Sequence, residues 1–185
     1  MKGVVFNLLE EVVRAEYGED TWDTLLEEAG VDGSYTSLGS YPDSDMMSLV
    51  MAASRALNTP PEAVIRWFGR KAIPLLRDRY PDFFAGHTSS RSFLLTLNSI
   101  IHPEVRKVYP GADVPVFEFE PQADEHTMLM GYRSARRLCA LAEGFIEGAA
   151  GVYGETVAIE QPSCVHRGDE RCLLKIEFRA QAQAA

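Results

Sequence analysis

Tyr132, Ser134 and Arg136 stand two residues apart and carry groups that can bind an anion. The alternation of apolar residues before them predicts a strand over residues 127–134, and side chains two apart in a strand point to the same side. Two hydroxyls and a guanidinium would then meet on one patch that suits a ligand with carboxylates. A solvated strand edge shows the same alternation, so the spacing alone leaves both interpretations open.

A histidine upstream of this motif lies in an apolar stretch, Ile100-Ile101-His102-Pro103. A haem needs an apolar slot, an axial base and partners for its propionates, and His102 could supply the base. Without the motif, a lone histidine on an apolar helix face is more often a buried structural residue than a ligand. Because a proline disfavours helical geometry at the residue before it, we expect a kink or break at His102.

Together, His102 and the Tyr-x-Ser-x-Arg motif resemble the H-NOX family of haem-based gas sensors, which includes the haem domain of soluble guanylate cyclase. The resemblance extends over essentially the whole chain. It implies a haem b whose iron is bound by His102 and whose propionates are held by Tyr132, Ser134 and Arg136. It also implies that Pro115 presses on the porphyrin face; a proline that begins a strand is the alternative for this residue.

The resemblance also implies which gas is bound. Oxygen-binding members of the family place a tyrosine in the helix after the motif, where this chain has Leu141, and the residues that support that tyrosine correspond to Leu9 and Ala72. None of these side chains donates the hydrogen bond that bound oxygen needs more than nitric oxide does. We therefore expect a nitric oxide sensor, able to bind carbon monoxide too, that excludes oxygen through an apolar distal pocket. Its predicted walls, of residue types that also build ordinary cores, are Val5, Leu9, Trp67, Leu141 and Phe145.

The mechanism implied by the resemblance is a trans effect. Nitric oxide weakens the bond between the iron and His102, and its rupture lets the half that carries His102 shift relative to the N-terminal helices. A stand-alone sensor acts through a partner, which for this family is typically a histidine kinase or an enzyme of cyclic di-GMP turnover. The sequence has no Ser-His-Asp signature, glycine-rich phosphate loop or His-Glu-x-x-His motif, so we do not expect an enzyme.

All three cysteines and one histidine form a second group of potential metal ligands: Cys139, Cys164, His166 and Cys172. Three thiolates and an imidazole match a closed, tetrahedral structural zinc site. Their spacing is not diagnostic, but some bacterial H-NOX proteins carry zinc at a site of this type; buried or free thiols are the alternative. Because exposed zinc thiolates can oxidise, the group also suggests an alternative function, a zinc-thiolate redox sensor in which haem is secondary.

The composition predicts one cytoplasmic domain. The chain has 185 residues, of which 46% are hydrophobic, and an odd number of cysteines argues against a disulfide framework. Because the net charge is −9 and no basic run exceeds two residues, neither nucleic acid nor a membrane surface is expected as a partner. The apolar runs are too short for a membrane span, and the beginning of the chain lacks the features of a signal peptide.

Hydrophobic periodicity predicts an α+β fold. We expect a helical N-terminal half packed on a C-terminal half with a four-stranded antiparallel sheet and a long helix, and haem between the halves. The predicted domain spans residues 1–180, with a distal part at 1–60 and a proximal part at 61–180, and a disordered tail follows at 181–185. Pro74 should kink or end the helix that begins near Pro61. The predicted strands cover 114–119, 127–134, 156–160 and 172–178, and the long helix covers 135–154.

Overall fold

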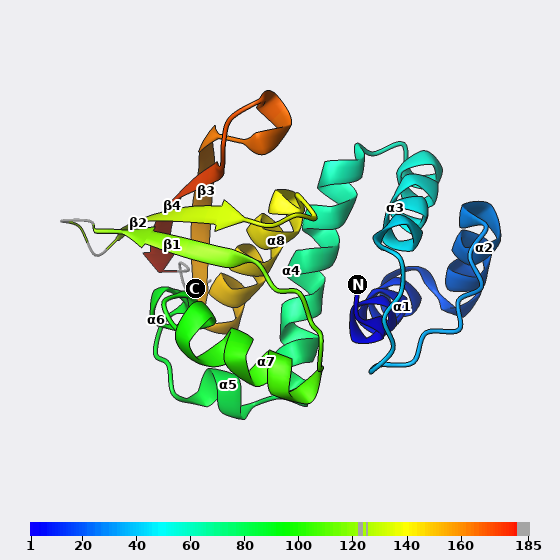
Figure 1. Ribbon diagram of the computed structural model, residues 1–185, viewed down its shortest axis with the longest axis horizontal. Helices are drawn as coiled ribbons and strands as arrows, with labels where there is room; N and C mark the ends of the chain where they lie inside the picture. The colour runs from blue at the N-terminus through cyan, green and yellow to red at the C-terminus, as the bar shows by residue number, and fades with distance from the viewer. Residues whose placement is uncertain (122–123, 125, 181–185) are drawn as a thin grey trace, which may run out of the picture.

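The computed structural model describes residues 1–121, 124 and 126–180, and the predicted tail at 181–185 lies outside the described residues. Helices fill the first half of the chain, while a sheet and one long helix fill the second (Figure 1). The α-helices are α1 Gly3–Tyr17, α2 Glu19–Ala29, α3 Asp43–Leu57, α4 Pro61–Arg79, α5 Asp82–Ala85, α6 Ser90–Leu94, α7 His102–Val108 and α8 Cys139–Val152. The strands are β1 Val116–Glu120, β2 Thr127–Arg133, β3 Glu155–Ser163 and β4 Cys172–Ala180.

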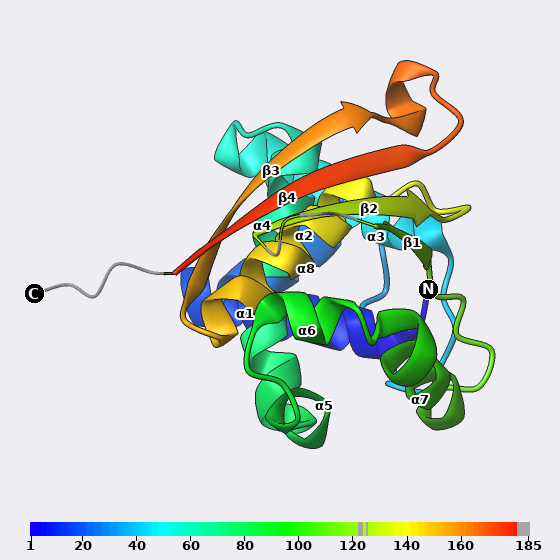
Figure 2. The same cartoon turned by 90° about the vertical axis from the view of Figure 1, so that its left-hand side faces the viewer.

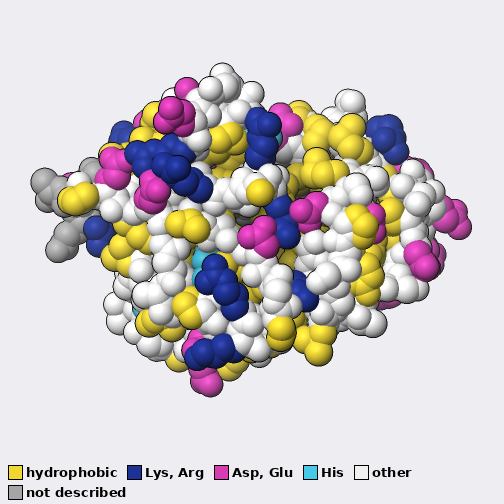
Figure 3. Space-filling view, viewed as in Figure 1, with side chains coloured by type: hydrophobic (Ala, Val, Ile, Leu, Met, Phe, Trp, Pro, Cys, Tyr) yellow, Lys and Arg dark blue, Asp and Glu magenta, His cyan; other side chains and the backbone are white. Residues whose placement is uncertain are grey.

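The four strands form one sheet in the order β1-β2-β4-β3, and each neighbouring pair is antiparallel. Helix α8 lies along one face of the sheet in both ribbon views (Figures 1 and 2). On that face Met130 and Leu174 are fully buried in one core with Ile146 of α8. The opposite face carries ion pairs such as Arg171–Glu118, and Figure 3 shows acidic and basic side chains intermingled over the sheet. The predicted α+β fold with a four-stranded antiparallel sheet is confirmed.

Two hydrophobic cores meet at α4. One core lies among α1 to α4 and includes Trp22 and Phe68, and the other lies between α8 and the sheet and includes Ile73 of α4. The helical half thus packs on the C-terminal half through α4, while the division at residue 60 stays a prediction. Among the residues that the structure describes, no helix is both long and apolar enough to cross a membrane.

Of the two outcomes predicted at Pro74, the end of the helix does not occur, because α4 continues to Arg79, while a kink there stays a prediction. A proline inside a helix removes the hydrogen bond to the carbonyl four residues earlier, which here belongs to Arg70. That carbonyl oxygen faces α8, where a Cβ on Gly148 would lie 2.7 Å from it. Packing against α8 supports α4 on both sides of the proline, so the helix persists.

Two more glycines allow α4 and α8 to approach closely. A Cβ on Gly144 would lie 2.1 Å from the carbonyl oxygen of Arg66, and a Cβ on Gly69 would lie 2.7 Å from that of Leu141. These distances leave no room for a side chain, because protein interiors are already close-packed. Arg66 forms an ion pair with Glu143 beside this contact at 2.5 Å. The close contact fixes the position of α8, which carries part of the site described below.

The segment between β2 and α8 differs from the prediction. β2 ends at Arg133, and α8 begins at Cys139 although the sequence predicts helix from residue 135. Arg137 has a φ of +55°, which is incompatible with a right-handed helix and delays its start. Ser134 and Arg136 therefore lie in a turn and not in a continuous strand.

The kink or break predicted at His102 is not found at that residue, and what precedes it is a change of helix type. Leu97–Ile101 forms a π-helical turn, whereas His102 has helical backbone angles of φ −65° and ψ −37° and begins α7. Pro103 fits there because the N–H that it lacks is not needed in the first turn of a helix. Single π-helical turns are frequently found at functional sites.

Candidate functional site

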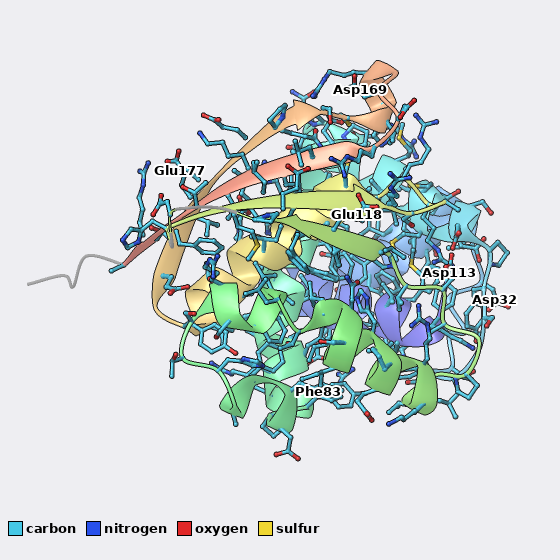
Figure 4. All side chains as sticks on the ribbon, turned by 60° about the vertical axis from the view of Figure 1, so that its left-hand side comes forward. Asp32, Phe83, Asp113, Glu118, Asp169 and Glu177 are labelled. Carbon is cyan, nitrogen blue, oxygen red and sulfur yellow. The ribbon has the colours of Figure 1, made fainter. Side chains whose placement is uncertain are left out.

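A cavity of about 440 Å³ lies between the helical half and the C-terminal half. Its wall is mostly apolar, and Val5, Leu141 and Phe145 contribute to it as predicted wall residues. Phe83 and Asp113, which are labelled in Figure 4, line it from two separate sides. A concave, largely apolar cavity with a few polar groups is typical of a cofactor site.

Two other predicted wall residues, Leu9 and Trp67, line a different cavity of about 70 Å³ among α1 to α4. Phe68 lines both cavities and stands between them. The Trp67 ring lies 5.6 Å from that of Tyr17, on the side of α4 that faces α1 and α2. Leu9 and Trp67 therefore belong to the core of the helical half rather than to the wall of the larger cavity.

His102 lines the larger cavity from the start of α7. Burial, and to a lesser extent the charge of Arg106, lower the pKa of its imidazole to about 4, although the carbonyl of Pro115 acts in the opposite direction as a hydrogen-bond acceptor. The ring of Phe117 lies 5.6 Å from the imidazole with an interplanar angle of 30°. The imidazole is thus neutral at pH 7, and a neutral imidazole that donates through one nitrogen keeps a lone pair on the other for a metal.

The three motif residues line the same cavity as His102, although they do not share one strand. Tyr132 is buried on β2, and its hydroxyl accepts a hydrogen bond from the N–H of Leu138 at 3.1 Å. The hydroxyl of Ser134 accepts one from the N–H of Arg136 at 3.2 Å. The turn after β2, rather than strand periodicity, brings these side chains together.

Arg136 is held by two acidic residues from distant parts of the chain. Its Nε lies 3.0 Å from a carboxylate oxygen of Asp43 at the start of α3, and its Nη1 lies 3.0 Å from one of Asp113. Burial acts to raise the pKa of Asp43, but the pKa is lowered overall because the N-terminal ammonium of Met1 and the guanidinium of Arg136 both donate hydrogen bonds to this carboxylate. Nη2 takes no part in these two pairs, so Arg136 can bind a further carboxylate while it links α3 to the turn after β2.

The three cysteines form a compact cluster beside this site. Their sulfur atoms all lie within 4.8 Å of one another, and Cys164 lies 3.8 Å from both Cys139 and Cys172. Burial raises the pKa of Cys139, and it raises that of Cys172 to about 12. The pKa of Cys164 is lowered despite burial, because the N–H of His166 and the two neighbouring thiols donate hydrogen bonds to its sulfur.

His166, the fourth predicted zinc ligand, lies outside this group. It belongs to a 3₁₀ turn, Val165–Arg167, and not to the strand on which its spacing from Cys164 was based. Its Nε2 is 2.7 Å from the carbonyl oxygen of Arg137. The structure therefore brings together three of the four predicted ligands.

The chain was compared with protein families and with solved structures. The model of the family described as Haem-NO-binding matches residues 2–161. The chain belongs to this family.

H-NOX structures resemble the chain over almost its full length. An H-NOX protein from S. oneidensis in the Fe(II)NO ligation state is 32% identical, with a TM-score of 0.90 over 97% of this chain and 99% of that one. The H-NOX domain from Shewanella oneidensis in the Fe(II)CO ligation state is 33% identical, with a TM-score of 0.87 over the same shares. A K. algicida H-NOX protein, 22% identical with a TM-score of 0.86 over 100% of both chains, supports the fold alone. H-NOX domains bind haem and are sensor domains rather than catalysts.

The residues around the larger cavity of this H-NOX domain fit a haem. The cavity offers an apolar slot, a neutral imidazole at His102 and, at Arg136, a guanidinium with a donor to spare. Tyr132 and Ser134 add hydroxyls beside that guanidinium. These are the groups that an iron and two propionates require, and a bound haem would supply an iron atom at which a diatomic gas binds.

Several side chains at the site carry no signal in the sequence. Tyr80 and Tyr109 each follow the last residue of a helix, line the larger cavity and form a hydrogen bond between their hydroxyls. Asp43 and Asp113 reach Arg136 only through the fold. No spacing rule connects these positions, because each contact joins segments that are far apart in the chain.

Proposed function

We propose that this H-NOX domain is a haem-based nitric oxide sensor in which His102 is the axial ligand of ferrous haem b. The observation that carries the proposal is that one apolar cavity joins His102 to Tyr132, Ser134 and Arg136. In this assignment the two hydroxyls and Nη2 of the guanidinium bind the propionates, and Pro115 contacts the porphyrin face. The visible absorption spectrum of the reduced, haem-loaded protein, recorded with and without nitric oxide, tests the assignment.

Discrimination against oxygen is part of the proposal. Leu141 lines the cavity and offers no hydrogen-bond donor, while Leu9 lies in the other cavity and Ala72 is fully buried and apolar. None of these three side chains can donate the hydrogen bond that stabilises the partial negative charge of bound oxygen, whereas nitric oxide and carbon monoxide depend on such a donor less.

Replacing Leu141 with tyrosine is expected to create an oxygen complex that persists in air. The new hydroxyl would enter the cavity from α8, and one hydrogen bond of about 1.4 kcal/mol would raise oxygen affinity about tenfold. Oxygen titration of the reduced protein, followed by absorption spectroscopy, measures the affinity. Leu141→Phe is the matched control, because it adds the ring without the hydroxyl. Equal oxygen affinity in the two variants would refute the role given to Leu141.

Signalling follows from the loss of the bond to His102. With haem bound through His102, loss of that bond on nitric oxide binding would free the imidazole, and α7 would then be able to shift relative to the helices of the distal part, residues 1–60. The proximal part, residues 61–180, then presents a changed surface to a partner, for which we propose a histidine kinase or an enzyme of cyclic di-GMP turnover. What supports an external partner is that the domain belongs to a sensor family.

A second candidate function rests on the thiol cluster. Three buried sulfur atoms within 4.8 Å of one another suit a soft divalent metal, for which we propose zinc, and a shift of the 3₁₀ turn would let His166 complete the site. A peroxide could oxidise two of the thiolates to a disulfide, itself being reduced to water, and because Cys172 pairs with Tyr132 across β4 and β2, this change would lie next to the haem motif. In this alternative the protein is a zinc-thiolate redox sensor.

Cys139→Ser is expected to lower bound zinc from one ion per chain to less than about a tenth of that, because a hydroxyl is a far weaker zinc ligand than a thiolate. Metal analysis of the purified protein measures the ratio. His166→Ala tests the fourth ligand separately, and full zinc content in that variant would show that the three thiols suffice. Full zinc content in Cys139→Ser would contradict the zinc site.

A further inference from the structure

Asn98 lies in the π-helical turn before His102, and its side chain binds the edge of β1. Its Nδ2 donates to the carbonyl oxygen of Phe117 at 2.5 Å, and its Oδ1 accepts from the N–H of Phe117 at 3.2 Å. β1 is the terminal strand of the sheet and pairs with β2 on its other edge. An amide side chain offers a donor group and an acceptor, as a peptide group does. Asn98 therefore forms the two hydrogen bonds with Phe117 that a neighbouring strand would otherwise form.

The same part of β1 also contacts the imidazole of His102. The Phe117 ring packs against it at 5.6 Å, and the carbonyl of Pro115, the residue just before β1, faces it as a hydrogen-bond acceptor. Both ribbon views place β1 next to the segment of α6 and α7 (Figures 1 and 2). Two independent contacts therefore join the His102 segment to β1, one through the imidazole and one through Asn98.

We propose that Asn98 is a positioning residue for the axial ligand. By holding the π-helical turn on β1, it keeps the imidazole of His102 in one orientation against Pro115 and Phe117. This inference rests on the proposed function, in which His102 binds the iron. Groups that orient a metal ligand from outside the coordination shell commonly change metal affinity or activity 10–100-fold when removed.

The link also gives the signal a route to the sheet. If the bond between His102 and the iron of a bound haem were lost, the His102 segment would move with Asn98 attached to Phe117, and β1 would be displaced with it. On β1, Glu118 is labelled in Figure 4 and pairs with Arg171 at the outer face of the sheet. A partner that binds this face of the sheet would then contact a changed surface after the release of His102.

Asn98→Ala tests the inference with two measurements. In the haem-free protein, amide hydrogen exchange at Phe117 is expected to rise about tenfold, because its N–H loses its acceptor. In the reduced, haem-loaded protein, the iron–histidine stretching band is expected to broaden and shift. After nitric oxide is added, His102 is expected to leave the iron about tenfold faster than in the unmodified protein. Asn98 is exposed, so the substitution leaves the cores intact.

Two variants serve as controls. Ser99→Ala changes the exposed neighbour in the same turn and is expected to leave both measurements unchanged. Asn98→Asp keeps an acceptor for the N–H of Phe117 but loses the donor to its carbonyl, so it should give an intermediate effect.

The outcomes separate this inference from the proposed function. Faster exchange at Phe117 with an unchanged stretching band and release rate would overturn the positioning role and leave His102 as the ligand. Unchanged exchange at Phe117 would show that the link itself is absent. An unmodified protein without an iron–histidine band would refute the proposed function, and this inference with it.

Discussion

Replacing His102 with alanine is expected to abolish the gas response while leaving the fold intact. The imidazole is the one predicted axial base in the larger cavity, and its neighbours Pro115 and Phe117 cannot replace it as a ligand. Because even groups outside the coordination shell change metal sites 10–100-fold, loss of the ligand should reduce the nitric oxide-dependent change in partner activity at least about 100-fold. Partner activity with and without nitric oxide measures this loss.

Two controls accompany this variant. Imidazole added to the buffer can enter the space left by the side chain, and it should restore the spectrum of the reduced protein without restoring the partner response, because it is not attached to α7. His87→Ala removes a histidine that contacts Phe93 at 5.7 Å and does not line the larger cavity, so it should have no effect on either. If the partner response persists in His102→Ala, the thiol cluster and not the haem carries the signal.

Replacing Gly144 with alanine is expected to destabilise the protein by more than about 3 kcal/mol, near the upper end of what overpacking costs. The added Cβ would lie 2.1 Å from the carbonyl oxygen of Arg66, which is backbone and cannot turn away. Relief therefore requires α4 and α8 to separate along their whole contact. Such a loss corresponds to a fall in Tm of roughly 6–12 °C for a chain of this size, measured by thermal unfolding.

The matched control for this variant lies in the same helix. A Cβ added to Gly151 of α8 would have open space around it, with none of the described residues within 4 Å, so Gly151→Ala should leave the packing unchanged. Because alanine favours a helix over glycine by about 1 kcal/mol, this variant should be slightly more stable than the unmodified protein. Equal destabilisation by both substitutions would show that the α4–α8 contact is looser than the structure indicates.

Much of the fold could be predicted because periodicity reports which side of an element is buried. The period-two pattern of Met128 and Met130 predicted β2, and both side chains are buried in the sheet core. Boundaries were harder, since they depend on tertiary contacts. Helix α8 starts late because of the backbone at Arg137, and α4 passes through Pro74 because α8 supports it.

The candidate site could be predicted only in part, for a related reason. Three residues that line the larger cavity with His102 could be predicted because they form the Tyr-x-Ser-x-Arg motif. Leu9 and Trp67 were predicted as wall residues from their apolar side chains, but they line the other cavity. Apolar side chains that line a cofactor cavity and those that fill an ordinary core follow the same helical spacing, so only the packing of α1 to α4 distinguishes them. Asn98 was not predicted at all, because its hydrogen bonds are to a strand that comes later in the chain.

The most direct test of the central claim is the visible absorption spectrum of the reduced, haem-loaded protein, recorded first without gas, then in air, and then with nitric oxide. We predict a ferrous haem with histidine as its only axial protein ligand, no change to an oxygen complex in air, and a nitric oxide complex from which the histidine is lost. An oxygen complex that persists in air would contradict the apolar distal pocket, and a nitric oxide complex that keeps its histidine would contradict signalling through release of His102.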